Sequence, residues 1–88
     1  MLKLFAIFDT KAMAFLPPFV LPNVDMALRE FTNCANDPSH AFCRNADDFI
    51  LSELGIFDDI DGVITPHSPH KIIGYAMAFK TPIKDNQS

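Results

Sequence analysis

Apolar residues along this chain fall into runs that short polar segments separate, and the spacing within each run predicts an element of structure. Leu2–Phe8 is apolar at every position except Lys3, which is typical of a strand in the interior of a sheet. Ala12–Pro22 is also mainly apolar but contains three prolines, which cannot donate hydrogen bonds to a neighbouring strand. We therefore expect this segment either to lie at a sheet edge or to be interrupted at Pro17-Pro18, with Phe19–Leu21 forming a short strand that pairs back towards the first one.

A helix is predicted over Asn23–Asp37, because small and apolar side chains recur there at helical spacing. Asn23 can cap its first turn, and Pro38 stops it. The segment Ser39–Asp48 is predicted to be a loop that Phe42 anchors. The apolar face of the helix consists of Val24, Ala27, Leu28, Phe31, Cys34 and Ala35.

Two further apolar runs flank an acidic turn that ends in Asp-Gly at residues 61–62, a pattern that favours a β-hairpin. Its strands are expected over Phe49–Phe57 and Val63–Thr65. Pro66 and Pro69 are expected to end the second strand.

The last part of the chain has a weaker pattern. Lys71–Phe79 is compatible with a short helix or with a last edge strand. Gly74 does not decide between them, because glycine weakens both kinds of element. Together the elements predict one α+β domain over residues 1–80 and a polar C-terminal tail over residues 81–88. We expect a small antiparallel sheet of three to four strands, with one main helix packed on one face and room for a short C-terminal helix.

The composition adds an expectation about self-association. The 88 residues are 49 % hydrophobic and include nine phenylalanines, and each aromatic ring can bury a large area. This apolar supply exceeds what one thin sheet can hide. We therefore expect a second copy of the chain to cover part of the apolar surface, as a homodimer.

The charge argues against binding of nucleic acid over the whole surface. Eleven acidic residues outnumber seven basic ones, for a net charge of −4, whereas such binding needs many phosphates to be neutralised. The charges are also unevenly spread. Residues 47–61 include six acids and no Lys or Arg, whereas Lys71, Lys80 and Lys84 lie in a segment with no acid before Asp85.

Two arrangements resemble metal sites but lack the ligands that such sites need. Residues 59–62, Asp-x-Asp-Gly, are like the start of a calcium loop, but the preceding acid and the following bidentate Glu are missing. His67 and His70 could be combined with Cys34 and Cys43, but their spacing is not that of a zinc site. We therefore predict no bound metal.

The sequence also lacks a pattern typical of catalysis. Ser39 lies beside His40, and His67 beside Ser68, but neighbours in sequence do not make a nucleophile–base pair. The three glycines are isolated and form no phosphate-binding loop. We expect a protein that is not an enzyme and needs no cofactor.

Basic and aromatic residues occur together near the C-terminus. Aromatic rings stack on unpaired bases while cations follow the backbone, so this set can bind single-stranded nucleic acid. The residues alone favour the alternative, in which the two rings pack in the core and the lysines are only surface charges. The set consists of Lys71, Tyr75, Phe79, Lys80 and Lys84.

The sequence shows no targeting signal. The apolar runs are far shorter than a membrane span, and no charged region followed by an apolar leader is recognisable. We therefore expect no membrane partner, and we expect Cys34 and Cys43 to be reduced thiols in a cytoplasm.

An ordered set of residues, rather than any single motif, resembles a known family. The set consists of Asp9, Lys11, Phe15, Pro18-Phe19, Ala27, Arg29, Phe31, Asn36-Asp37-Pro38, Phe42, Asp48-Phe49, Leu51, Gly55, Phe57-Asp58, Gly62 and Pro66. In this order it is similar to the small nonstructural protein of single-stranded DNA phages in the microvirus family, gokushovirus group. The resemblance covers residues 2–79 and departs at Ala46, where relatives commonly have a proline.

The resemblance implies a nonstructural phage protein that acts in viral genome replication in the host cell cytoplasm. Proteins of this family are usually described as DNA-binding proteins that favour single-stranded DNA synthesis. Two hypotheses follow: a DNA-binding protein, or a dimeric interaction module that acts on the replication initiator or the capsid precursor. An accessible basic patch at Lys71, Lys80 and Lys84 would favour the first, and an exposed apolar edge with scattered lysines the second.

Overall fold

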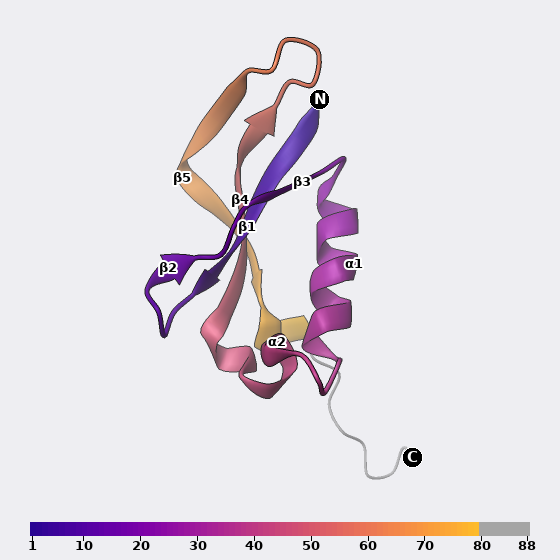
Figure 1. The fold of residues 1–88 in the computed structure, drawn as a ribbon, viewed down its shortest axis with the longest axis vertical. Coiled ribbons are helices and arrows are strands. Elements are labelled where there is room, and N and C mark those ends of the chain that lie inside the picture. The colour runs from indigo at the N-terminus through magenta and orange to yellow at the C-terminus, as the bar shows by residue number, and fades with distance from the viewer. Residues whose placement is uncertain (80–88) are drawn as a thin grey trace.

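Pairing between strands that are far apart in the sequence builds the centre of the molecule (Figure 1). In the computed structural model, which describes residues 1–79, β1 (Leu2–Asp9) pairs antiparallel with β4 (Phe49–Phe57). The other side of β4 pairs antiparallel with β5 (Ile64–Tyr75). The sheet has five strands in the order β2-β1-β4-β5, with β3 also paired to β1. The α+β class is therefore confirmed, with one strand more than expected.

Two short strands share the outer edge of β1. β2 (Ala14–Phe15) pairs with the end of β1, and β3 (Phe19–Leu21) pairs with its first half. The prolines at 17 and 18 separate the two strands, since a proline has no amide hydrogen for the ladder. The prediction of a strand over Phe19–Leu21 that pairs back to β1 is confirmed.

One helix, α1 (Val24–Ala35), covers one face of the sheet (Figure 1). The side chain of Asn23 caps it, because Oδ1 accepts a hydrogen bond of 2.9 Å from the backbone N–H of Met26. Ala27, Phe31 and Ala35 are its buried residues. The predicted helix is therefore confirmed, with the first predicted residue and the last two, Asn36 and Asp37, outside it.

The predicted loop after α1 contains two short helical elements. These are α2 (Ala41–Arg44) and a 3₁₀ turn, η1 (Ala46–Asp48). Four residues are too few to show a helical period in the sequence, which explains why a loop was expected. Phe42 does anchor this segment, with its ring centroid 5.6 Å from that of Phe31 and 4.6 Å from that of Phe49.

The hairpin between β4 and β5 forms as predicted at its turn, where Gly62 has a φ of +79°. The prediction that Pro66 and Pro69 end the second strand is wrong, because β5 continues to Tyr75. Register explains how the prolines are accommodated. Gly55 pairs with Pro66 and Glu53 with Lys71, so residues 67–70 bulge out of an edge strand.

The segment that was compatible with a helix or a strand contains both. β5 ends at Tyr75 and α3 (Ala76–Phe79) follows it directly. The predicted polar tail at 81–88 lies outside the described residues.

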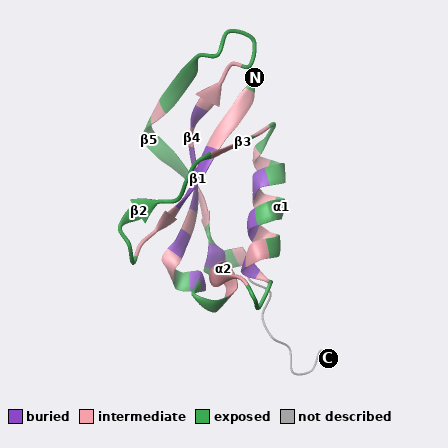
Figure 2. Cartoon of the chain, viewed as in Figure 1, coloured by how far each residue is buried: buried purple, intermediate pink, exposed green. Residues whose placement is uncertain are grey.

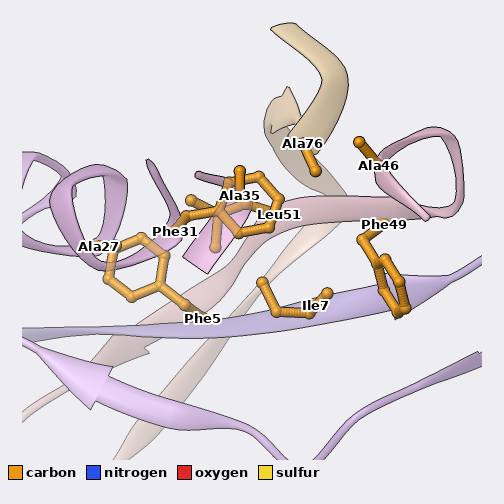
Figure 3. Packing of buried hydrophobic residues seen from close by; sticks show 9 residues of the cluster. All are labelled: Phe5, Ile7, Ala27, Phe31, Ala35, Ala46, Phe49, Leu51 and Ala76. Atoms are coloured by element: carbon orange, nitrogen blue, oxygen red, sulfur yellow. The ribbon is translucent and has the colours of Figure 1, made fainter. Parts of the chain in front are cut away.

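The apolar core lies between the sheet and α1, and Figure 3 shows its side chains meeting there. Phe5 and Leu51 are fully buried, from the two central strands. A buried aromatic or aliphatic side chain stabilises the fold by about 1.5–3 kcal/mol, so this layer holds the helix on the sheet. The cluster consists of Phe5, Ile7, Ala27, Phe31, Ala35, Ala46, Phe49, Leu51 and Ala76.

Candidate nucleic-acid interface

The face of the sheet opposite α1 carries large side chains that no described helix covers. Side chains alternate between the two faces of a strand, so the neighbours of the core residues Ile7 and Leu51 point the other way. The register places Phe15, Phe8, Ile50 and Tyr75 in one row across β2, β1, β4 and β5. We name this surface the open face. It consists of Leu4, Phe8, Phe15, Val20, Ile50, Ile72 and Tyr75.

The open face is accessible at both sheet edges. Tyr75 is 49 % exposed and Phe15 is 45 % exposed. Figure 2 shows exposed residues along much of β5 and over β2. Two aromatic rings are therefore presented to solvent at opposite ends of one row of side chains.

The structure does not bring the predicted aromatic pair to one surface. Tyr75 lies on the open face, whereas Phe79 packs on the helix side, with its ring centroid 6.0 Å from that of Phe31. The carbonyl of Phe79 also accepts a hydrogen bond of 3.1 Å from Nδ2 of Asn36. A Cβ at residue 74 would overlap the Phe79 ring, which is why glycine fits there.

The predicted lysines can be placed only in part. Lys71 is exposed on β5, four residues before Tyr75. Lys80 and Lys84 lie outside the described residues. Lys71 and Tyr75 therefore share an edge strand, but Lys71 pairs with Glu53 and precedes Ile72 of the open face, so it lies on the other face of that strand from Tyr75.

Two aromatic residues of this surface were not predicted. The ring of Phe15 lies 4.8 Å from that of Phe8, and the ring of His70 lies 5.6 Å from that of Phe15 in an edge-on arrangement. Phe15 stands in a strand of two residues and His70 in a bulge, and neither has a periodic signal in the sequence. Because β2 and β5 are opposite edges of the sheet, the bulge of β5 must bring the His70 ring across the open face to reach Phe15.

A buried charged cluster holds the bulge of β5. The side chain of Glu53 is 2 % exposed, and its Oε2 lies 2.6 Å from Nε2 of His67 and 3.4 Å from Nζ of Lys3. Burial raises the pKa of Glu53, but the hydrogen bond from His67 and the charge of Lys3 outweigh it, and the pKa lies below its ordinary value. An ionised carboxylate only accepts hydrogen bonds, so His67 is the donor. In residues 1–79, no three His, Cys, Asp or Glu side chains are grouped as metal ligands.

The acidic turn between β4 and β5 lies at one end of the elongated sheet, whereas Asp47 and Asp48 precede β4 at the other end. The turn between β4 and β5, which holds Asp58, Asp59 and Asp61, is at the top of Figure 1, and the N-terminal amine lies 3.3 Å from Asp59. Tyr75 is at the other end of β5. The acidic turn is therefore far along the strand from the exposed Tyr75 ring.

Comparisons with known proteins agree with a phage origin. The family model described as Phage ORF5 protein matches residues 2–79, which is most of the chain. No curated protein and no solved structure matches significantly. None of the helices in residues 1–79 has the length and apolar character that a membrane span needs. Because the family model covers residues 2–79, the chain belongs to the Phage ORF5 protein family.

Proposed function

We propose that this phage protein is a non-enzymatic, nonstructural protein that acts in replication of a single-stranded DNA genome in the host cytoplasm, by binding single-stranded DNA on its open face. The observation that carries the proposal is the exposure of Tyr75 and Phe15 on a sheet face without a helix. Every base has a π-face, so such rings can stack on unpaired bases without regard to sequence. The resemblance to microvirus nonstructural proteins supports the same function.

The charges favour a single strand over a duplex. The net charge of −4 makes neutralisation of many phosphates unfavourable, but Lys71 is exposed at the edge strand that carries Tyr75, on the other face of that strand. Lys80 and Lys84 follow shortly in the sequence. Three cations can follow one backbone while the rings hold the bases, and a dimer would double the number.

The direct test measures binding of a fluorescent oligothymidine by anisotropy at low salt, with a duplex of equal length as the comparison. Tyr75→Ala should weaken binding of the single strand by roughly 5- to 150-fold, since one stacked base contributes about 1–3 kcal/mol. Tyr75→Phe keeps the ring and should bind as the wild type does. Ile60→Ala, at a position that is 94 % exposed in the acidic turn, is the control for surface truncation.

Two results would contradict the proposal. One is the absence of single-strand binding at low salt, and the other is unchanged affinity in Tyr75→Ala. Phosphate contacts are tested separately by Lys71→Gln, which should reduce the salt slope by about 0.7.

A second function is favoured by the aliphatic side chains of the open face. Val20 is 39 % exposed and Ile72 is 60 % exposed, and neither stacks on a base. A face of this kind suits a dimeric module that acts on the replication initiator or the capsid precursor. Ile72→Lys separates the two functions. It should break a dimer that buries this face, but it should preserve or strengthen binding of DNA beside Tyr75, as sedimentation and anisotropy would show.

A further inference from the structure

A cavity of about 350 Å³ lies between α1 and the segment that runs from β2 into β3. Side chains of β1, β3, α1 and α2 form its walls, so it lies on the helix side of the sheet. The open face lies on the other side, and DNA bound there would not fill this cavity. Its size falls within the range of small-ligand sites, about 300–1,000 Å³.

Most of the cavity wall is apolar. Phe19 from β3, Phe31 from α1 and Phe42 from α2 line it. Leu16 also lines it and is 37 % exposed, which marks the side where the cavity meets solvent. Moving an apolar ligand from water onto such a wall is favourable.

Two side chains of α1 add polarity to the wall. Glu30 is the one charged residue among those that line the cavity, and Cys34 lies one turn after it. Burial raises the pKa of the Cys34 thiol, and the negative charges of Glu30 and Asp37 raise it further. The guanidinium of Arg44 offsets part of the charge of Asp37. The potential at this wall is therefore negative, mainly because of Glu30, and it favours a cation.

We infer that this cavity is a binding site for a small apolar molecule that carries one positive charge, an aryl- or alkylammonium compound. The apolar part would lie between Phe19, Phe31 and Phe42. The ammonium group would lie at the solvent side, beside the carboxylate of Glu30.

The test uses three probes of similar shape and different charge: phenethylammonium, 2-phenylethanol and phenylacetate. Each is titrated into the ¹⁵N-labelled full chain, and the amide shifts of α1 and of residues 16–21 are followed by NMR. Phenethylammonium should bind most tightly, the alcohol less tightly and phenylacetate least. The absence of saturable shifts in these two segments, or equal affinities for the cation and the anion, would overturn the inference.

Two variants separate the charge from the cavity. Glu30→Gln should weaken phenethylammonium about two- to five-fold, the range of an exposed ion pair, and leave 2-phenylethanol unchanged. Cys34→Leu adds volume to the wall and should weaken all three probes. Arg29→Gln, on α1 but not in the cavity wall, is the control, and melting temperatures show that each variant folds. If Glu30→Gln binds phenethylammonium as tightly as the wild type does, the assigned role of its charge is wrong. If Cys34→Leu does so, the assigned location is wrong.

Discussion

We predict that the buried carboxylate of Glu53 stabilises the folded state. Glu53→Gln keeps the size of the side chain and one acceptor oxygen, but it removes the charge that faces His67 and Lys3. A hydrogen bond to an ionised group is roughly twice as strong as a neutral one, and its net contribution is about 1.5–3 kcal/mol. Lys3 is 32 % exposed and adds little, about 0.5 kcal/mol. We therefore expect the free energy of unfolding to fall by about 1–2 kcal/mol.

The expected assay is thermal unfolding followed by circular dichroism at pH 7. For a domain of this size, each kcal/mol shifts the melting temperature by roughly 4–8 °C. Asp47→Asn makes the same acid-to-amide change at an exposed position and is the matched control, with an expected shift close to zero.

The stabilisation by the Glu53 carboxylate should depend on pH in a defined direction. The pKa of Glu53 in the folded state lies below its ordinary value of 4.5, so the unfolded state binds more protons between the two values. The stabilisation is fully present above pH 4.5 and is lost as the pH falls through the folded pKa. The difference between wild type and Glu53→Gln should therefore shrink in acid. Equal melting temperatures at pH 7, or a difference that persists unchanged well below the folded pKa, would refute the reasoning.

Two further predictions concern packing. Phe31→Ala should lower the free energy of unfolding by about 3–5 kcal/mol, because the ring is 2 % exposed in the core; a fall of only a degree or two in melting temperature would show that it packs loosely. Gly74→Ala should lower it by about 1–3 kcal/mol, because the added Cβ overlaps the Phe79 ring, and Phe79→Leu in the same chain should restore part of the loss. No recovery in the double variant would place the strain elsewhere.

Local signals explain which parts of the fold could be predicted. The helix α1 carries its own cap at Asn23 and its own apolar period, and the Asp-Gly turn of the hairpin needs only neighbouring residues. The end of β5 could not be predicted, because a proline is excluded from the middle of a sheet but tolerated in an edge-strand bulge. Whether Pro66 stands at an edge depends on the strand order, which is a long-range property.

The candidate site shows the same limit more strongly. Tyr75 and Phe79 are four residues apart and were grouped as neighbours on that ground. The chain changes from strand to helix between residues 75 and 76, so the two rings lie on opposite sides of the sheet. Phe15 joins the open face only through pairing with Phe8. Periodicity within one segment carries no information about either event.

The last prediction links the buried cluster to the open face. His67 and His70 are the two ends of the bulge in β5, where Glu53 holds the first and the Phe15 ring contacts the second. If the carboxylate positions the bulge, Glu53→Gln should move the imidazole proton shifts of His70 towards those of an unfolded histidine, since the ring current of Phe15 would no longer act on them.

Ile7→Val is the control for this link, because it lowers stability by a similar amount, about 0.5–1.5 kcal/mol, from the core side of β1. Measured at a temperature where both variants are fully folded, it should leave the His70 shifts unchanged. Equal changes in the two variants would mean that the loss of overall stability, and not of the carboxylate, moves His70. Unchanged shifts in Glu53→Gln would mean that the Phe15 contact holds the bulge without the carboxylate. A change in the His70 shifts in Glu53→Gln but not in Ile7→Val is expected only if the buried carboxylate of Glu53 positions the bulge beside Phe15, on the surface proposed to bind DNA.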